Sequence, residues 1–250
     1  MNFHETTKKY YAKWLGADAT VLDGSGVEFV YSAERDNIQK GYTRPFHIFA
    51  FHMIEEKRLV ISYGERAKNA IDKLKATDFA LTRKEISAAI EASCGKKPSI
   101  GYKYVYNGGV SYTGGAVQLA ADDFPRYMEF FEAVHPNVKD TSWVREYFDE
   151  MTEAGLWFAV EGGDGRLLSV ADSPDMPFMD DIAREVGIYT LPEARGRGFA
   201  KIACLASAQN VVRMGICPIW STSVNNPASD ALAKAIGFSR LAETFTVTLD

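Results

Sequence analysis

The stretch VGIYTLPEARGRGFAK (residues 186–201) is the most informative part of the chain for the fold. It begins like a strand, turns through Gly196 and Gly198, and continues into a segment with helical periodicity. Such a turn directs successive backbone N–H groups into one concavity, and the helix adds about half a positive charge at its N-terminus. The two glycines let the backbone approach a ligand closely, and Arg195 and Arg197 add charge. The stretch predicts a phosphate or pyrophosphate site; the alternative is a tight connection with solvated arginines.

The elements around this turn predict a mixed α/β domain over residues 116–250. Apolar alternation and helical spacing follow one another without a repeated unit. We expect strands at residues 116–120, 157–161, 167–171, 184–190, 219–223 and 241–249, and helices at residues 124–134, 142–154, 198–214 and 228–235.

A glycine-rich segment separates this domain from the first part of the chain. Residues 107–115 contain four glycines, which suit a linker better than a core element. Upstream we expect a capping box at Thr82 and Glu85, a helix end at Gly95 and tyrosines on one face of a strand over residues 102–106. The predicted domains are therefore 1–115, a smaller α/β domain of unknown role, and 116–250.

A second motif lies downstream, in NPASDALAKAIGF (residues 226–238). Together the two motifs resemble the GNAT superfamily of N-acetyltransferases. The family's Arg/Gln-x-x-Gly-x-Gly/Ala signature matches residues 195–200, and Asn226 precedes Gly237 by eleven positions, as in the family. The resemblance covers residues 116–250 and implies an α/β fold with a GNAT-like mixed sheet flanked by helices. A degenerate copy of the same fold is one interpretation of residues 1–115.

The resemblance also implies roles for individual residues. The backbone amides of the turn would hold the pyrophosphate of acetyl-CoA: Arg195, Gly196, Arg197, Gly198, Phe199 and Ala200. The strand residues Ile188, Tyr189 and Thr190 would line the pantetheine arm, with backbone groups of Ile188 and Thr190 pairing with its amides. Asn226 would hydrogen-bond the same arm, assisted by Ser229. For Asn226 the alternative is a helix N-cap, which asparagine also forms well.

The catalytic residues are less clearly marked. Glu185 is the first candidate for the general base, because an ammonium must lose a proton before it attacks a thioester. Tyr189 is the second. The alternatives are a solvent-facing glutamate and a core tyrosine. Many GNAT enzymes carry a tyrosine acid seven residues after the asparagine, where this chain has Ala233. The acidic stretch from Asp172 to Asp181 is either an attractant for a cationic amine or a solvated loop.

The function that the resemblance implies is acetyl transfer from acetyl-CoA to a primary amine, by direct attack in a ternary complex. Ala233 keeps open a catalytically silent module that binds acyl-CoA. A binder of nucleotide phosphates using the same turn is the third alternative.

The composition of the chain argues against several classes of partner. The net charge of −5 comes from 28 basic and 33 acidic residues without basic blocks, which argues against a nucleic-acid partner. Three cysteines and four histidines show no ligand spacing, so we expect no metal. No signal peptide or membrane-length apolar run is evident, which favours a cytoplasmic protein with no membrane partner. The expected acceptor is a small-molecule or peptide amine, and the oligomeric state stays open.

Overall fold

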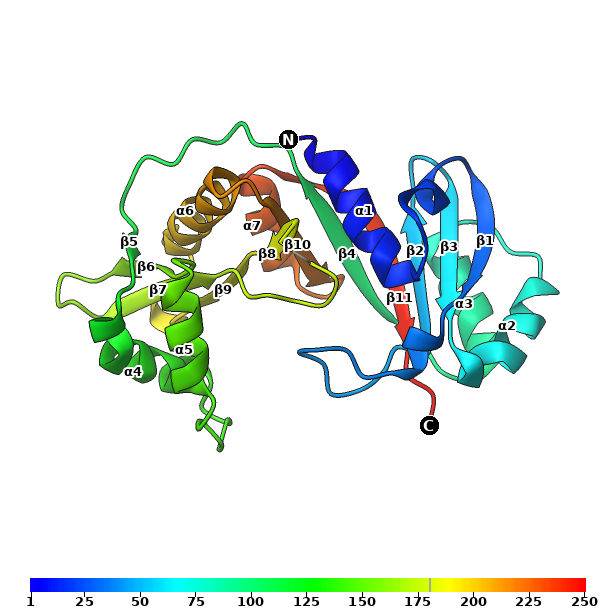
Figure 1. The fold of residues 1–250 in the computed structure, drawn as a ribbon, viewed down its shortest axis with the longest axis horizontal. Helices are drawn as coiled ribbons and strands as arrows, with labels where there is room; N and C mark the ends of the chain where they lie inside the picture. Colours follow the sequence, from blue (N-terminus) through cyan, green and yellow to red (C-terminus); the bar gives the residue numbers. More distant parts are fainter. Residues whose placement is uncertain (180) are drawn as a thin grey trace.

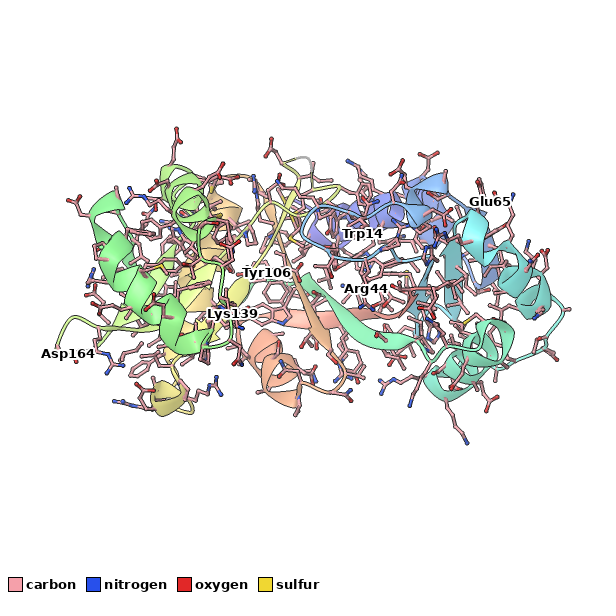
Figure 2. All side chains as sticks on the ribbon, turned by 90° about the horizontal axis from the view of Figure 1, so that it is seen from below. Trp14, Arg44, Glu65, Tyr106, Lys139 and Asp164 are labelled. Carbon is pink, nitrogen blue, oxygen red and sulfur yellow. The ribbon has the colours of Figure 1, made fainter. Side chains whose placement is uncertain are left out.

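The structure is a computed structural model that describes residues 1–179 and 181–250. Its strands form two sheets, which lie toward opposite ends of an elongated molecule (Figure 1). Figure 2 shows the same long axis from below, with Asp164 and Glu65 near its two ends and Tyr106 close to its middle.

The larger sheet has seven strands in the order β1-β3-β2-β11-β4-β10-β8. Neighbouring strands are antiparallel except for the pairs β1–β3 and β10–β8, which are parallel. In chain order these strands are β1 (Gly26–Tyr31), β2 (Ile48–Met53), β3 (Arg58–Tyr63), β4 (Ser99–Tyr106), β8 (Ala183–Glu185), β10 (Cys217–Ser223) and β11 (Phe238–Val247).

The smaller sheet has four antiparallel strands in the order β5-β6-β7-β9. They are β5 (Val117–Gln118), β6 (Phe158–Glu161), β7 (Leu167–Asp172) and β9 (Gly187–Thr190). A turn at residues 162–165 joins β6 and β7, and the strand predicted over residues 116–120 is reduced to β5. Residues 184–190, predicted as one strand, instead belong to β8 in one sheet and β9 in the other.

Helices cover both sheets. On one face of the large sheet lies α1 (Phe3–Leu15), whose Tyr10, Tyr11 and Trp14 are buried against β2 and β10. The opposite face is covered by α2 (Lys68–Lys75), α3 (Arg83–Cys94), α6 (Phe199–Arg213) and α7 (Pro227–Ala235). The small sheet packs against α4 (Phe124–Val134) and α5 (Val144–Glu153), and α6 also contacts β6 and β7.

The ends of α3 agree with the local sequence signals. Thr82 accepts a hydrogen bond from Glu85 N at 3.3 Å, and Gly95 ends the helix in the left-handed region at φ 75°. The Thr82 cap and Gly95 were predicted, because caps depend on residues close together in the chain. The reciprocal bond of the expected capping box is not formed, since Thr82 N donates to Ala80 O at 2.8 Å.

Strand β4 precedes the predicted domain boundary in the chain but pairs with strands that follow it. It lies between β10 and β11, although it precedes the glycine-rich connection and they follow it (Figure 1). Its Tyr104 hydroxyl donates to Asp230 on α7 at 2.6 Å, and Arg240 on β11 donates to the same carboxylate at 3.0 Å. These bonds, first of all that from Arg240, lower the pKa of Asp230. The boundary between residues 115 and 116 therefore does not separate two sheets.

This interleaving can be tested by cutting the chain. A protease site placed at Thr113–Gly115, which is exposed, should be cleaved without loss of structure. We expect the two pieces to elute together in size-exclusion chromatography and to separate only in denaturant, because β4 is hydrogen-bonded on both edges. Separate elution of two folded pieces under native conditions would contradict the shared sheet.

Candidate functional site

The extended segment over residues 183–190 pairs with a different neighbouring strand in each of its two parts. Strand β8 pairs with β10, and the last bond to β10 runs from Val186 N to Ile219 O at 3.0 Å. Beyond Val186 the chain pairs with β7 as β9, at the edge of the small sheet. A gap between β9 and the second half of β10 follows from this change.

The register of β7 and β9 shows which peptide groups of β9 bond to β7 and which face the gap. Leu191 N donates to Leu168 O at 3.0 Å, in step with the pairing of Thr190 and Ser169. Hydrogen-bonded and non-hydrogen-bonded pairs alternate along an antiparallel ladder. Gly187 and Tyr189 therefore bond to β7, and the peptide groups of Ile188 and Thr190 point toward the gap. An extended ligand could bind there as an added strand.

The turn after β9 leads directly into α6. A short 3-10 turn at Pro192–Ala194 is followed by Gly196 and Gly198, with φ of 73° and 85°. Gly198 is the N-cap of α6 and supplies no side-chain bond to the first turn. No other atom lies within 4 Å of a Cβ built at either glycine, so the N-terminus of α6 is open on this side. An open helix N-terminus of this kind is able to bind an anion.

Two arginines flank this turn. Both Arg195 and Arg197 are exposed. Arg195 Nε donates to Thr190 O at 3.3 Å, and the Arg197 guanidinium lies 4.8 Å from the centre of the Phe199 ring. Their charges therefore lie beside the open helix end.

Asn226 and Ser229 lie where β10 leads into α7. Asn226 Oδ1 accepts from Ser229 N at 3.1 Å, so the helix-cap alternative is realised. Ser229 Oγ accepts from Trp220 Nε1 at 3.1 Å. The cap uses the oxygen of the Asn226 amide, and its exposed NH₂ group remains able to donate to a ligand. Ala233 is fully buried and belongs to the apolar cluster that contains Trp220.

Glu185 and Tyr189 line different cavities. The Glu185 carboxylate accepts a hydrogen bond from Ser221 Oγ and lines a cavity of about 800 Å³. The Tyr189 side chain is 50% exposed and packs against His135, with ring centres 4.4 Å apart, beside a cavity of about 250 Å³. Tyr189 is therefore no core residue, and the two candidates are not brought into one pocket.

The acidic stretch divides between the interior and the surface. Asp172 accepts from the Tyr147 hydroxyl at 2.7 Å, and burial raises the pKa of this carboxyl group. Asp175 pairs with Lys40 at 3.3 Å, and Asp181 with Arg184 at 3.2 Å. The stretch is thus more than a solvated loop; Asp180 lies outside the described residues.

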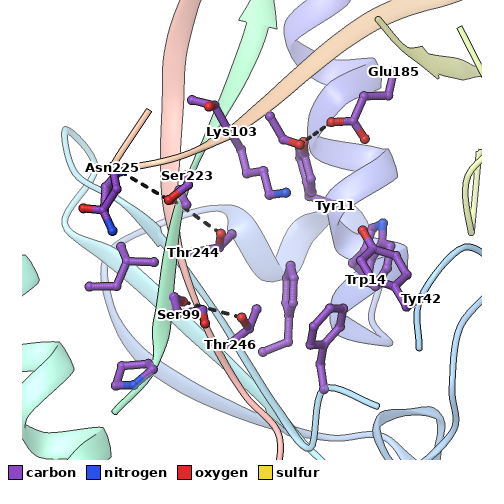
Figure 3. A pocket seen from close by; sticks show the side chains of 18 of the residues that line it. Tyr11, Trp14, Tyr42, Ser99, Lys103, Glu185, Ser223, Asn225, Thr244 and Thr246 are labelled. Carbon is purple, nitrogen blue, oxygen red and sulfur yellow. Dashed lines mark hydrogen bonds between the residues drawn. The ribbon is translucent and has the colours of Figure 1, made fainter. Parts of the chain in front are cut away.

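The large cavity lies where the first and last parts of the chain meet (Figure 3). Besides Glu185 it is lined by aromatic residues of α1, by residues 42–49, and by polar residues of β4, β10 and β11. Lys103 on β4 projects into it. Sequence reasoning missed this cavity, because it is assembled from segments far apart in the chain and contains no local motif.

The described part of the chain contains neither a cluster of metal ligands nor a membrane-spanning helix. Within residues 1–179 and 181–250, no group of three or more His, Cys, Asp or Glu side chains is placed to hold a metal ion. No helix in these ranges has both the length and the apolar character to span a bilayer.

Comparison with known proteins agrees with the geometry. A family model described as GNAT acetyltransferase matches residues 145–247. The uncharacterized N-acetyltransferase YdfB of Bacillus subtilis (strain 168) is 29% identical over 112 residues, which are 44% of this chain and 41% of YdfB.

A solved structure shares the fold over part of the chain. A GNAT-family acetyltransferase from Colwellia psychrerythraea superposes with a TM-score of 0.51 at 17% identity, over 60% of this chain and 56% of its own. A GNAT phosphinothricin acetyltransferase from Sinorhizobium meliloti, solved in complex with acetyl-CoA, gives 0.43 at 19% identity, over 54% and 87%.

The chain thus spans about half the length of YdfB and of the Colwellia protein. The predicted mixed sheet flanked by helices is confirmed. The predicted family is confirmed as well: the C-terminal half of this chain, over residues 145–247, belongs to the GNAT acetyltransferases.

Proposed function

We propose that the protein transfers the acetyl group of acetyl-CoA to a primary amine. One observation carries the proposal: the open edge of β9 leads without interruption into the open N-terminus of α6. Such a path offers peptide groups to an extended amide-containing arm and then an anion site to a pyrophosphate. Family membership of residues 145–247 supports acetyl-CoA as the ligand that combines the two.

In the proposed complex, the pyrophosphate binds the amides of residues 195–200, and Arg195 and Arg197 balance part of its charge. The pantetheine arm lies in the gap, against the peptide groups of Ile188 and Thr190. Asn226 donates to this arm from the opposite side of the gap, through the amide NH₂ group that its capping bond leaves available.

Transfer proceeds in one ternary complex. The ammonium of the acceptor gives a proton to the Glu185 carboxylate, and the amine nitrogen then attacks the thioester carbonyl carbon. The carbon–sulfur bond breaks and CoA leaves as a thiolate, which needs no protonated partner because thiols are acidic. The second proton of the attacking nitrogen passes to this thiolate or to water, so the products are the neutral amide and CoA. Positioning supplies most of the acceleration. Tyr189 lies outside the cavity of Glu185, so we assign it no proton transfer.

The buried Ala233 supports the second candidate, a module that binds acyl-CoA without turnover. Release of free CoA, detected by a thiol reagent in the presence of a panel of amines, separates the two functions. Tight CoA binding with no release above the rate of hydrolysis would favour the silent module, and tighter binding of ATP than of CoA would favour a nucleotide binder.

The anion site is tested by Gly198→Asp. A carboxylate at the N-terminus of α6 should repel the pyrophosphate and weaken CoA binding by about 100-fold or more, measured by calorimetry. Gly215→Asp is the matched control, because Gly215 has a similar φ of 79° and open surroundings near the other end of α6. Unchanged CoA affinity in a folded Gly198→Asp protein would refute the site.

The two roles of Asn226 can be separated by Asn226→Ser. Serine also caps helices well, so the melting temperature should change little. The donor to the pantetheine arm is lost, and we expect CoA affinity to fall by roughly 2- to 12-fold, the value of one net hydrogen bond. An unchanged affinity would leave Asn226 with the capping role alone.

The base is tested by Glu185→Gln. We expect kcat/KM to fall by about 100-fold or more with unchanged CoA affinity, because the amide cannot accept the proton. Ser221→Ala removes only the hydrogen bond to Glu185 and should have a smaller effect. Full activity of Glu185→Gln would exclude Glu185 as the base.

A further inference from the structure

The cavity beside Glu185 has a polar floor where a sheet under a helix is usually apolar. Hydroxyl groups and a glycine occupy neighbouring positions on three strands, in register with one another: Ser221 and Ser223 on β10, Ser99 and Gly101 on β4, and Thr244 and Thr246 on β11. Most of these side chains are too small to fill the space beneath α1, and they offer several donors and acceptors to a ligand.

The opposite wall of the cavity is aromatic. Trp14 of α1 contacts Tyr42, Phe46 and Phe49, with ring centres 5.7, 6.3 and 5.5 Å apart. Tyr10 and Tyr11 extend this wall along α1 (Figure 3). A volume of about 800 Å³ lies in the range of small-molecule sites. The cavity therefore suits a ligand with an apolar side and a polar side.

Among the described residues, Lys103 in the floor of the cavity has no carboxylate within ion-pair distance. Its cross-strand neighbour is Ser221, which donates to Glu185, so the three residues form a row across β4, β10 and β8. Within the described residues no acidic side chain forms an ion pair with Lys103, and its Nζ lies 5.8 Å from the centre of the Tyr11 ring. Burial lowers the pKa of Lys103, with Glu185 opposing the shift. Lys103 is half-buried, and an ammonium that is partly withdrawn from water is stabilised by a negative charge beside it, which an anionic ligand would supply.

We infer that the acceptor of the proposed acetyl transfer is an amino carboxylate, with its amine at Glu185 and its carboxylate at Lys103. The inference rests on the proposed function for the identity of the reaction. Glu185 is in register with Ile219, two residues before Ser221, so the Cα atoms of Glu185 and Lys103 are separated by two strand spacings and two residues along the strand, roughly 12 Å. Side chains reaching inward shorten the distance between the two charges. One cation in the floor matches one negative charge, which favours a carboxylate over a phosphate dianion; Lys97, the other lysine of this cavity, is exposed.

The test uses matched pairs of probes: standard amino acids and the amines that lack their carboxylate, such as phenylalanine and phenethylamine. Binding is measured by calorimetry on the full chain with CoA present, and kcat/KM by CoA release from acetyl-CoA. We expect at least one carboxylate member to be preferred by about tenfold or more, the value of a charge-assisted bond. Lys103→Met should abolish the preference for the carboxylate member of each pair, and Lys103→Arg should retain part of it.

Lys97→Met is the matched control and should keep the preference, because Lys97 is exposed. The inference is overturned if no amino acid binds better than its amine, or if Lys103→Met keeps the preference. The binding titration distinguishes this failure from that of the proposed function. A carboxylate preference without turnover refutes acetyl transfer alone, and turnover of plain amines without preference refutes the amino carboxylate alone.

Discussion

The candidate site depends on the point at which residues 183–190 exchange one neighbouring strand for another. The backbone N–H and C=O groups of each residue in a strand form their ladder hydrogen bonds with the strand on one side only, so this exchange leaves one side of the chain unpaired. As far as Val186 the chain bonds to β10, and beyond it the chain bonds to β7. No side chain could create the resulting gap, because it follows from the choice of backbone partners. The turn of Gly196 and Gly198, the start of α6 and the end of β10 take their positions from this change.

The first half of the chain is part of the candidate site. Glu185 lies on a short strand of the C-terminal half, but half of the residues that line the cavity beside it belong to α1, residues 42–49 and β4. The two proposed ligands thus lie with different parts of the chain: acetyl-CoA against residues of the GNAT region, and the acceptor largely against residues that precede it. The segment before residue 116 would then determine which amine is acetylated, through the charge of Lys103 and the aromatic wall around Trp14.

Sequence reasoning succeeded where the decisive contacts are local. The turn at residues 195–200, the cap formed by Thr82 and the left-handed Gly95 depend on residues a few positions apart, and each was predicted. The place of β4 between β10 and β11 was not predicted, because strand alternation shows which face of a strand is buried but not which strand lies beside it. Lys103 was missed for the same reason: its importance comes from Tyr11, Ser221 and Glu185, which lie far away in the chain. The roles of Glu185 and Asn226 remain predictions.

The position of β11 has a consequence for biosynthesis. This last strand bonds to β2 on one edge and β4 on the other, so it joins the two parts of the large sheet. A chain that emerges from the ribosome in order exposes the edges of β2 and β4 until residues 238–247 have been made. Pairing between segments so distant in sequence is slow, and open strand edges favour aggregation. Chaperones that cover these edges would therefore favour correct folding, and loss of residues 238–247 would leave the two parts of the large sheet without their common strand.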